Sequence, residues 1–208
     1  MARQDITKRW ILLCMGVLLS GVGQGLTIVA DLGLAPWDVF HQALSNIMGW
    51  SIGQVVILVS FLTVLCWIPL KQKPGIGTLL GIVLVGLLID LTIHVSPEPT
   101  SMPAKWGYLL SGILIFGLGI CLFVNANLGV GPRDGLMVGI AKKGLSIQKT
   151  RLLIDGIAFT AGWVLGGKVG IGTVVIVLGV GPSVQFSMKM TSAWSYGPLH
   201  TGAAHEKQ

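Results

Sequence analysis

The stretch Gly21-Val-Gly-Gln-Gly-Leu-Thr-Ile-Val-Ala-Asp-Leu-Gly-Leu-Ala-Pro-Trp-Asp38 returns later in the chain as Gly117-Leu-Gly-Ile-Cys-Leu-Phe-Val-Asn-Ala-Asn-Leu-Gly-Val-Gly-Pro-Arg-Asp134. The two copies share the outer glycines, the Leu-Gly pair, the proline and the last aspartate. Shorter motifs repeat at about the same distance of 95 residues: Gly-x-Ser-Ile at 49–52 and 144–147, and Gly-Ile-Gly-Thr at 75–78 and 170–173. The chain therefore consists of two copies of one unit, an organisation common among membrane transporters.

Composition places both units in a lipid bilayer. Hydrophobic residues make up 52% of the chain and charged residues 11%, against roughly 25% charge in soluble domains. The mean hydropathy is +0.80. A membrane-crossing helix needs about 20 apolar residues. Six stretches are nearly free of charge and predict crossings, at residues 10–30, 54–70, 76–94, 107–126, 151–166 and 170–188.

A weaker segment follows the first crossing of each unit, at residues 36–48 and 132–145. Asp38 and His41 in the first segment, and Arg133 and Lys142 in the second, oppose a crossing that faces lipid. A charge at the centre of a membrane helix costs about 2.5–3.5 kcal/mol even on insertion scales. We expect two short helices that either dip into the membrane or lie flat on it.

The distribution of Lys and Arg predicts the orientation of the chain. With six crossings and a cytoplasmic amino terminus, twelve of the 14 Lys and Arg residues lie in the cytoplasm, and only Lys105 and Lys168 lie outside. Because three crossings per unit is an odd number, the second unit must be inverted relative to the first. Both termini are then cytoplasmic.

The sequence thus predicts an all-α polytopic membrane protein. Its six transmembrane helices form two inverted three-helix repeats, each with an additional short proline-led helix. The predicted segments are a cytoplasmic amino terminus (1–9), membrane repeat 1 (10–95), an external linker (96–106), membrane repeat 2 (107–190) and a flexible cytoplasmic tail (191–208).

The duplicated Leu-Gly-x-x-Pro-x-Asp motif is the best candidate for a functional site in this sequence. Its glycine permits a sharp turn, and its proline suits the first position of a helix, where no N–H is needed. The structural residues of this motif are Gly33, Pro36, Gly129 and Pro132. The aspartates that follow, Asp38 and Asp134, either cap the new helices or line a pathway for a polar solute or ion.

The two copies differ at positions that would matter to a pathway. Three positions differ between the first and the second copy: Asp31 corresponds to Asn127, Trp37 to Arg133, and His41 to Met137. Drift and the charge rule for orientation offer another explanation. The candidate residues for a substrate or ion pathway are Asp31, Trp37, Asp38, His41, Asn127, Arg133, Asp134, Arg151 and Asp155.

Asp155 is the acidic residue placed well inside an apolar stretch. It follows Arg151 by four residues, so the two side chains share a helix face and form an interfacial ion pair in the simplest interpretation. An embedded carboxylate is also a candidate proton or ion site, with Arg151 as its partner.

No motif in the sequence indicates catalysis, a cofactor or a metal site. The run Gly21-Val-Gly-Gln-Gly lies in a membrane stretch without a preceding strand, and the three cysteines lack metal-ligand spacing. We therefore expect a protein that is not an enzyme and uses no cofactor. The net charge of +6 follows from the orientation rule and does not indicate nucleic-acid binding.

The motifs Asp-Leu-Gly-Leu-Ala-Pro-Trp-Asp at 31–38, Asn-Leu-Gly-Val-Gly-Pro-Arg-Asp at 127–134 and the Gly-Ile-Gly-Thr pair resemble those of YczE-like bacterial membrane proteins, the YczE/YyaS/YitT group. The resemblance covers about residues 8–190 and implies a bacterial cytoplasmic (inner) membrane location. It implies no activity.

Two function classes remain open. The first is a small secondary transporter that moves a small solute by alternating access of its two inverted repeats, with the lipid bilayer as environment and a homodimer as the expected assembly. The second is a non-transporting membrane accessory or regulatory protein. A transporter should have a polar-lined cavity between the repeats, whereas an accessory protein could have a closed apolar core.

Overall fold

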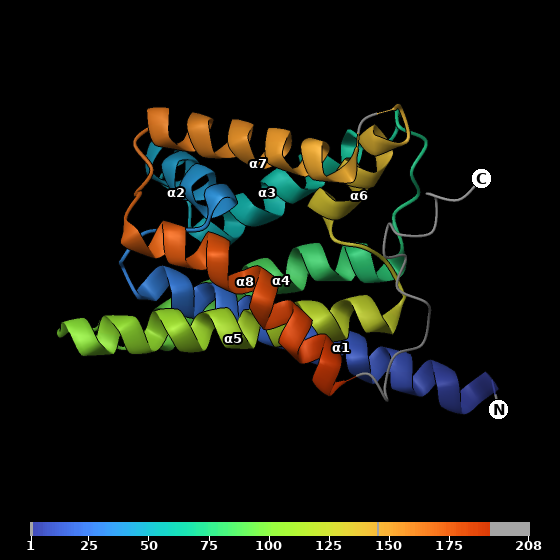
Figure 1. Ribbon diagram of the computed structural model, residues 1–208, viewed down its shortest axis with the longest axis horizontal. Coiled ribbons are helices and arrows are strands. Elements are labelled where there is room, and N and C mark those ends of the chain that lie inside the picture. Colours follow the sequence, from blue (N-terminus) through green and yellow to red (C-terminus); the bar gives the residue numbers. More distant parts are fainter. Residues whose placement is uncertain (1, 145, 192–208) are drawn as a thin grey trace.

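The computed structural model describes residues 2–144 and 146–191, and in this part of the chain the secondary structure is entirely helical. Figure 1 shows the arrangement. The helices are α1 (Ala2–Val29), α2 (Pro36–Met48), α3 (Ile52–Leu65), α4 (Ile76–Val95), α5 (Met102–Ala126), α6 (Pro132–Ala141), α7 (Ile147–Val164) and α8 (Ile171–Met190). The predicted all-α class is confirmed. The predicted tail, apart from Thr191, lies outside the described residues.

Each repeat contributes four helices in the same order, long, short, medium and long. A proline occupies the start of both α2 and α6. Helix α2 spans the predicted range, whereas α6 ends at Ala141, before the predicted end at residue 145, and Gly144 then takes a φ of 107°. A side chain is disfavoured at that angle, so glycine suits the turn. Helices α1 and α5 begin at Ala2 and Met102, before the predicted crossings at 10–30 and 107–126.

Helices α1 and α5 form the central contact of the fold. They cross in antiparallel fashion through small residues: a Cβ on Gly16 or Gly23 of α1 would lie within 2.5 Å of the backbone nitrogens of Phe123 and Phe116 of α5. Gly119 of α5 is equally close to α1, since its Cβ would lie 2.4 Å from a backbone nitrogen there. Glycines at such crossings let two backbones approach closely, the usual way in which membrane helices associate.

The two repeats also exchange backbone contacts through their duplicated motifs. The N–H of Gly77 donates to the carbonyl of Leu128 at 3.0 Å, and the N–H of Gly172 donates to the carbonyl of Leu32 at 2.8 Å. Each Gly-Ile-Gly-Thr motif therefore binds the Leu-Gly turn of the other repeat. We call these two contacts the interlocks. One holds the turn before α2 and the other the turn before α6.

The helices form two groups (Figure 1). Helices α4 and α8 pack on the α1/α5 pair, whereas α2, α3, α6 and α7 pack on one another in a second group. Close approaches by glycine join this second group: Gly162 of α7 meets the backbone of Phe40 in α2, and Gly135 of α6 meets the indole of Trp67. That indole donates to the carbonyl of Pro132 at 3.0 Å.

The two repeats differ in how their third and fourth helices meet. In repeat 1, α3 packs on α4, and a Cβ on Gly53 would lie 2.1 Å from the carbonyl oxygen of Gly86. Asp90 of α4 accepts from the Ser51 hydroxyl at 2.5 Å and from the Gly53 N–H at 2.7 Å. The position that corresponds to Gly53 is Gln148 in α7, whose side chain prevents so close an approach. Among the described helices, α7 accordingly has no comparable packing on α8.

Four helices are long and apolar enough to cross a membrane: residues Ile6–Val29 of α1, and α4, α5 and α8. Helices α2 and α3, bent by 112° at their break, would add a fifth if they are counted as one span. Helix α3 has only 14 residues. Helix α7 has 18 but includes three charged side chains. The six-crossing arrangement therefore stays a prediction.

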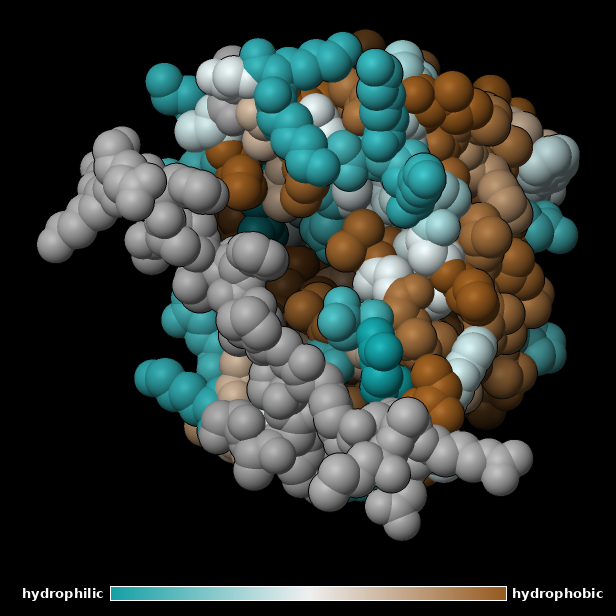
Figure 2. Space-filling view, turned by 90° about the vertical axis from the view of Figure 1, so that its right-hand side faces the viewer, coloured by the Kyte–Doolittle hydropathy of each residue, from teal (hydrophilic) through white to brown (hydrophobic). Residues whose placement is uncertain are grey.

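Charged side chains gather at the ends of the bundle. Figure 2 looks onto the end where the turns after α3, α5 and α6 lie, and hydrophilic residues rim its upper part while hydrophobic residues cover the right flank. Lys71, Lys73, Lys142 and Lys143 are exposed in these turns. This is the end to which the sequence assigned most of the positive charge.

The α1/α5 crossing yields a stability prediction. Gly119→Val should lower the free energy of unfolding by about 1–3 kcal/mol or more, because the added carbons meet the backbone of α1. Gly107→Val is the matched control, since a Cβ on Gly107, in the same helix, meets nothing within 4 Å. Thermal unfolding in detergent measures both. Equal losses in the two variants would contradict the close crossing.

Candidate functional site

The start of α2 carries a buried carboxylate. Asp38 is 2% exposed and His41, one turn later on the same face, is 6% exposed. The Gln24 side-chain amide of α1 donates to Oδ1 of Asp38 at 2.6 Å, and Nδ1 of His41 lies 3.3 Å from the same oxygen. Among the described residues, the hydrogen bonds of Asp38 thus run to side chains of α1 and α2, in place of the free N–H groups that the capping interpretation requires.

Trp37 connects this carboxylate region to the second repeat. Its indole N–H donates to Oδ1 of Asp155 in α7 at 2.8 Å. The other oxygen of Asp155 lies 3.6 Å from Nε of Arg151, so the predicted i,i+4 ion pair is present. The side chain of Arg151 is 66% exposed, and an ion pair with so exposed a partner contributes little stability by itself. The bond from Trp37 adds a side-chain contact between α2 and α7 to the close backbone approach at Gly162.

Arg133 of α6 lies over the ring of Trp37. Its guanidinium carbon lies 6.0 Å from the centroid of the Trp37 ring, within the range of a cation–π contact. Trp37 and Arg133 occupy corresponding positions in the two repeats. This contact therefore joins equivalent positions of the two repeats.

These side chains form one group, which we call the central polar cluster. It combines two carboxylates, two guanidinium groups, an imidazole, an amide and an indole from four helices. Its members are Gln24, Trp37, Asp38, His41, Arg133, Arg151 and Asp155. Both repeats contribute, and the charges can balance within the cluster.

Three predicted pathway residues lie elsewhere. Asp31, with a φ of 55°, accepts from Lys105 at 3.2 Å and from Lys168. The hydrogen bond from Lys168, more than that from Lys105, holds the pKa of Asp31 below its usual value despite partial burial. The stabilisation is present above the usual pKa and is lost as the pH falls through the lowered one. It is small, because the Asp31 side chain is 49% exposed.

Asn127 and Asp134 mark the corresponding turn of repeat 2. Asn127 has a φ of 49° and ends α5, and its carbonyl accepts from Arg9. Asp31 and Asn127 thus hold the same left-handed conformation, which Asp and Asn tolerate best among residues with a side chain. Because both residue types tolerate this conformation, the backbone accepts either Asp or Asn at this position of the two copies. Asp134 is exposed at the start of α6.

Sequence reasoning missed Gln24. It lies inside the duplicated stretch, and its counterpart is the apolar Ile120, so an amide in an apolar helix was the available signal. Its partner could not be predicted, because Gln24 and Asp38 lie on different helices and the turn between them hides from the sequence that the two side chains meet.

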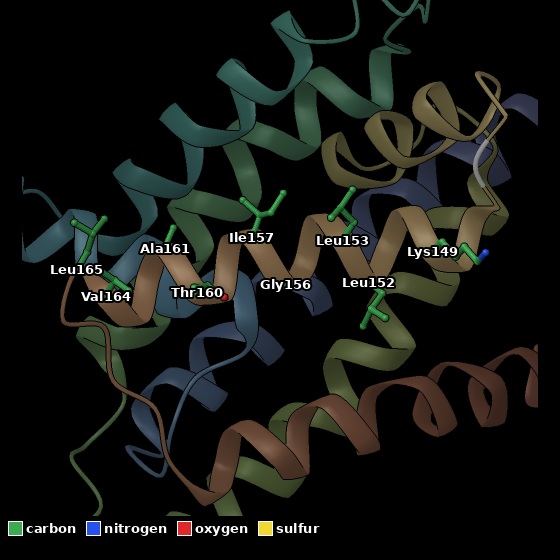
Figure 3. A pocket seen from close by; sticks show the side chains of 9 residues that line it. All are labelled: Lys149, Leu152, Leu153, Gly156, Ile157, Thr160, Ala161, Val164 and Leu165. Atoms are coloured by element: carbon green, nitrogen blue, oxygen red, sulfur yellow. The ribbon is translucent and has the colours of Figure 1, made fainter.

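An open groove of about 970 Å³ runs along α7 (Figure 3). Residues of α7 and the Leu165 that follows it line the groove, and neither Arg151 nor Asp155 belongs to the lining. Lys149 and Thr160 are its polar members, and the mainly apolar face suits lipid chains better than a polar solute. The central polar cluster is therefore the better candidate site.

Comparison with known proteins identifies the class and then the family. Apolar helices of membrane-spanning length and an uncharacterized membrane protein among the relatives define an all-helical membrane protein. Residues 7–189 match the family of unknown function DUF6198, and the chain belongs to this family. The YczE-like resemblance is thereby confirmed.

Three relatives are similar over most of their length. A Haemophilus influenzae protein described as uncharacterized is 36% identical, over 90% of this chain and 86% of its own. The uncharacterized membrane protein YczE of Bacillus subtilis is 32% identical, over 89% of this chain and 88% of its own. The uncharacterized protein YyaS of the same organism is 26% identical, over 78% and 84%. No solved structure matches this chain.

The bond between Trp37 and Asp155 can be tested by a double-mutant cycle. Trp37→Phe and Asp155→Ala should each lower stability by about 1–3 kcal/mol, because each leaves a polar partner without its bond. The double variant should lose less than the sum, with a coupling of about 0.5–3 kcal/mol. Thermal unfolding in detergent measures the cycle, and Trp163→Phe, at a side chain that is 62% exposed, is the control. Strict additivity would contradict the contact.

Proposed function

We propose that this protein is a small secondary transporter that moves a small polar solute by alternating access, with the central polar cluster as its binding region. The contact between Trp37 and Arg133 carries the proposal. It brings equivalent positions of the two repeats together, as expected where two halves of a carrier meet around one site. A polar cluster inside a membrane protein is costly to maintain and is a functional site by default.

The proposal includes six crossings and an inverted second repeat. In support, Figure 1 shows α3 and α7 running between the same two ends of the bundle as the long helices. The antiparallel crossing of α1 and α5 fits an inversion of one repeat relative to the other. A helix of 14 residues spans about 21 Å at 1.5 Å per residue, so α3 needs a locally thinned bilayer or polar flanking residues.

Alternating access would require the seam between the repeats to open. Two contacts of Trp37, to Asp155 and to Arg133, cross that seam at the cluster. A solute with hydrogen-bonding or charged groups could replace them. The described conformation then corresponds to a closed state in which protein groups satisfy one another.

The second candidate is a non-transporting membrane accessory protein. The observation that favours it is the position of the groove, which lies on the outer face of α7 and not beside the cluster. In that case the cluster and the interlocks only fasten the repeats together. The small solute and the homodimer expected from the sequence remain part of the transporter proposal.

Side-specific labelling tests the transporter proposal without a known solute. In a variant that lacks the three native cysteines, Gln24→Cys should react with a membrane-impermeant maleimide from either side of sealed vesicles, because alternating access exposes the cluster to each side in turn. Lys73→Cys, in the turn after α3, and Lys105→Cys, near the start of α5 at the opposite end, should each react from one side only. Failure of Gln24→Cys to react from either side would support the closed accessory protein and overturn the transporter.

Topology reporters test the six crossings independently. Reporter fusions that end after Pro74 should give a cytoplasmic signal, and fusions that end after Pro99 or Gly167 an external signal, because the positive turns stay inside. A fusion to the whole chain should again be cytoplasmic. A cytoplasmic signal at Pro99 or an external carboxyl terminus would contradict the arrangement.

A further inference from the structure

We propose that Asp38 and His41 form a proton-binding pair, and that the proton is the coupling ion of the carrier. The pair itself follows from the geometry of α2, whereas its coupling role rests on the proposed function. The two side chains lie one turn apart on the same face, with His41 Nδ1 3.3 Å from Asp38 Oδ1. Both are more than nine-tenths buried.

The charges around the pair leave it without another close counter-ion. From α1, Gln24 supplies an uncharged amide, and α3 contains no Asp, Glu, Lys, Arg or His. From α7, Asp155 and Arg151 pair with each other. From α6, Arg133 lies over the Trp37 ring. Among the described residues, His41 is thus the one group within ion-pair distance of Asp38 that becomes cationic when it is protonated.

This environment favours one bound proton per pair. Without a proton, the pair would carry a negative charge with no cation in contact with it, and with two protons a positive charge with no anion in contact with it. Either state is costly when the charge is shielded from water. With one proton the pair is neutral overall. Entry of water or of a charged solute into the cluster would change this balance and allow the proton to leave or a second one to bind.

The groups at the site suit a proton better than a metal cation. Hard cations such as Mg²⁺ and Ca²⁺ bind oxygen ligands in number. Here a nitrogen of Gln24 and a nitrogen of His41 point at the same carboxylate oxygen. Histidine changes its charge between about pH 5 and 8, and chains of Asp, Glu and His carry protons in membrane pumps and transporters.

Within the described residues, the proton site occurs in one of the two repeats. The counterparts of Gln24 and His41 in the second repeat are Ile120 and Met137, so repeat 2 keeps Asp134 but lacks the partners. Divergence of the copies therefore leaves the carboxylate–imidazole pair in repeat 1 alone.

Nuclear magnetic resonance of the whole protein, with labelled histidine and aspartate, tests the pair directly. Over a pH titration in detergent, the His41 imidazole and the Asp38 carboxyl signals should change together. Asp38→Asn should alter the titration of His41, and His41→Gln that of Asp38. His94, on α4 and apart from the pair, should titrate alike in all variants. Independent titration of the two groups would overturn the proposal.

The coupling role has its own readout. The ratio of maleimide labelling between the two sides at Gln24→Cys should depend on pH, and His41→Gln in that background should remove the dependence. The ratio is the readout because pH changes the thiolate fraction, and with it the rate, on both sides alike. Labelling from both sides in a ratio that stays constant with pH would overturn the coupling and leave the transporter intact. A coupled titration together with labelling from neither side would instead keep the proton pair and reject the transporter.

Discussion

The structure depends on the two interlocks, in which a backbone N–H of one repeat binds the turn of the other. Gly75 and Gly170 lie so close to the opposite turns that a Cβ would come within 2.4 and 2.3 Å of the carbonyl oxygens of Leu128 and Leu32. No residue with a side chain fits at that distance. Because each bound turn leads directly into α2 or α6, the interlocks fix where the proline-led helices begin. They thereby decide which side chains reach the middle of the molecule.

The central polar cluster follows from this exchange. The two turns lie at opposite ends of the bundle (Figure 1), and from them the chain leads into the first residues of α2 and α6, where the side chains of Trp37 and Arg133 meet. An identical pair of tryptophans or of arginines would meet there if the copies had not diverged. In this chain one copy carries a ring and the other a cation, which is attracted to the face of that ring. The duplication thus sets the position, and the difference between the copies sets the chemistry.

Much of the fold could be predicted from the sequence, because it depends on local patterns. Charge-free stretches indicated the long helices, and Pro36 began α2 where expected. Partners far apart in the chain could not be predicted. Trp67, which is 1% exposed, bonds to Pro132 and fills the space beside Gly135, and nothing near it in sequence points to α6. The bond between Trp37 and Asp155 is of the same kind. Both residues were candidates, but only the packing of α7 on α2 joins them.

The difference between the repeats bears on which part of the molecule can move. Helix α3 is fastened to α4 through Gly53, Ser51 and Asp90. In the second repeat, Gln185 of α8 takes the place of Asp90, and Gly181 takes the place of Gly86. A Cβ on Gly181 would meet nothing within 4 Å, so no helix packs closely there. Helix α7 is held instead by α2, through Gly162 and Asp155. A displacement of α7 therefore disturbs no close packing on α8, whereas a displacement of α3 must break a buried glycine contact. Separation of α7 from α8 therefore meets less resistance than separation of α3 from α4. A movement of α7 away from α2, in contrast, has to break the Gly162 contact and the bond between Trp37 and Asp155 at the edge of the cluster.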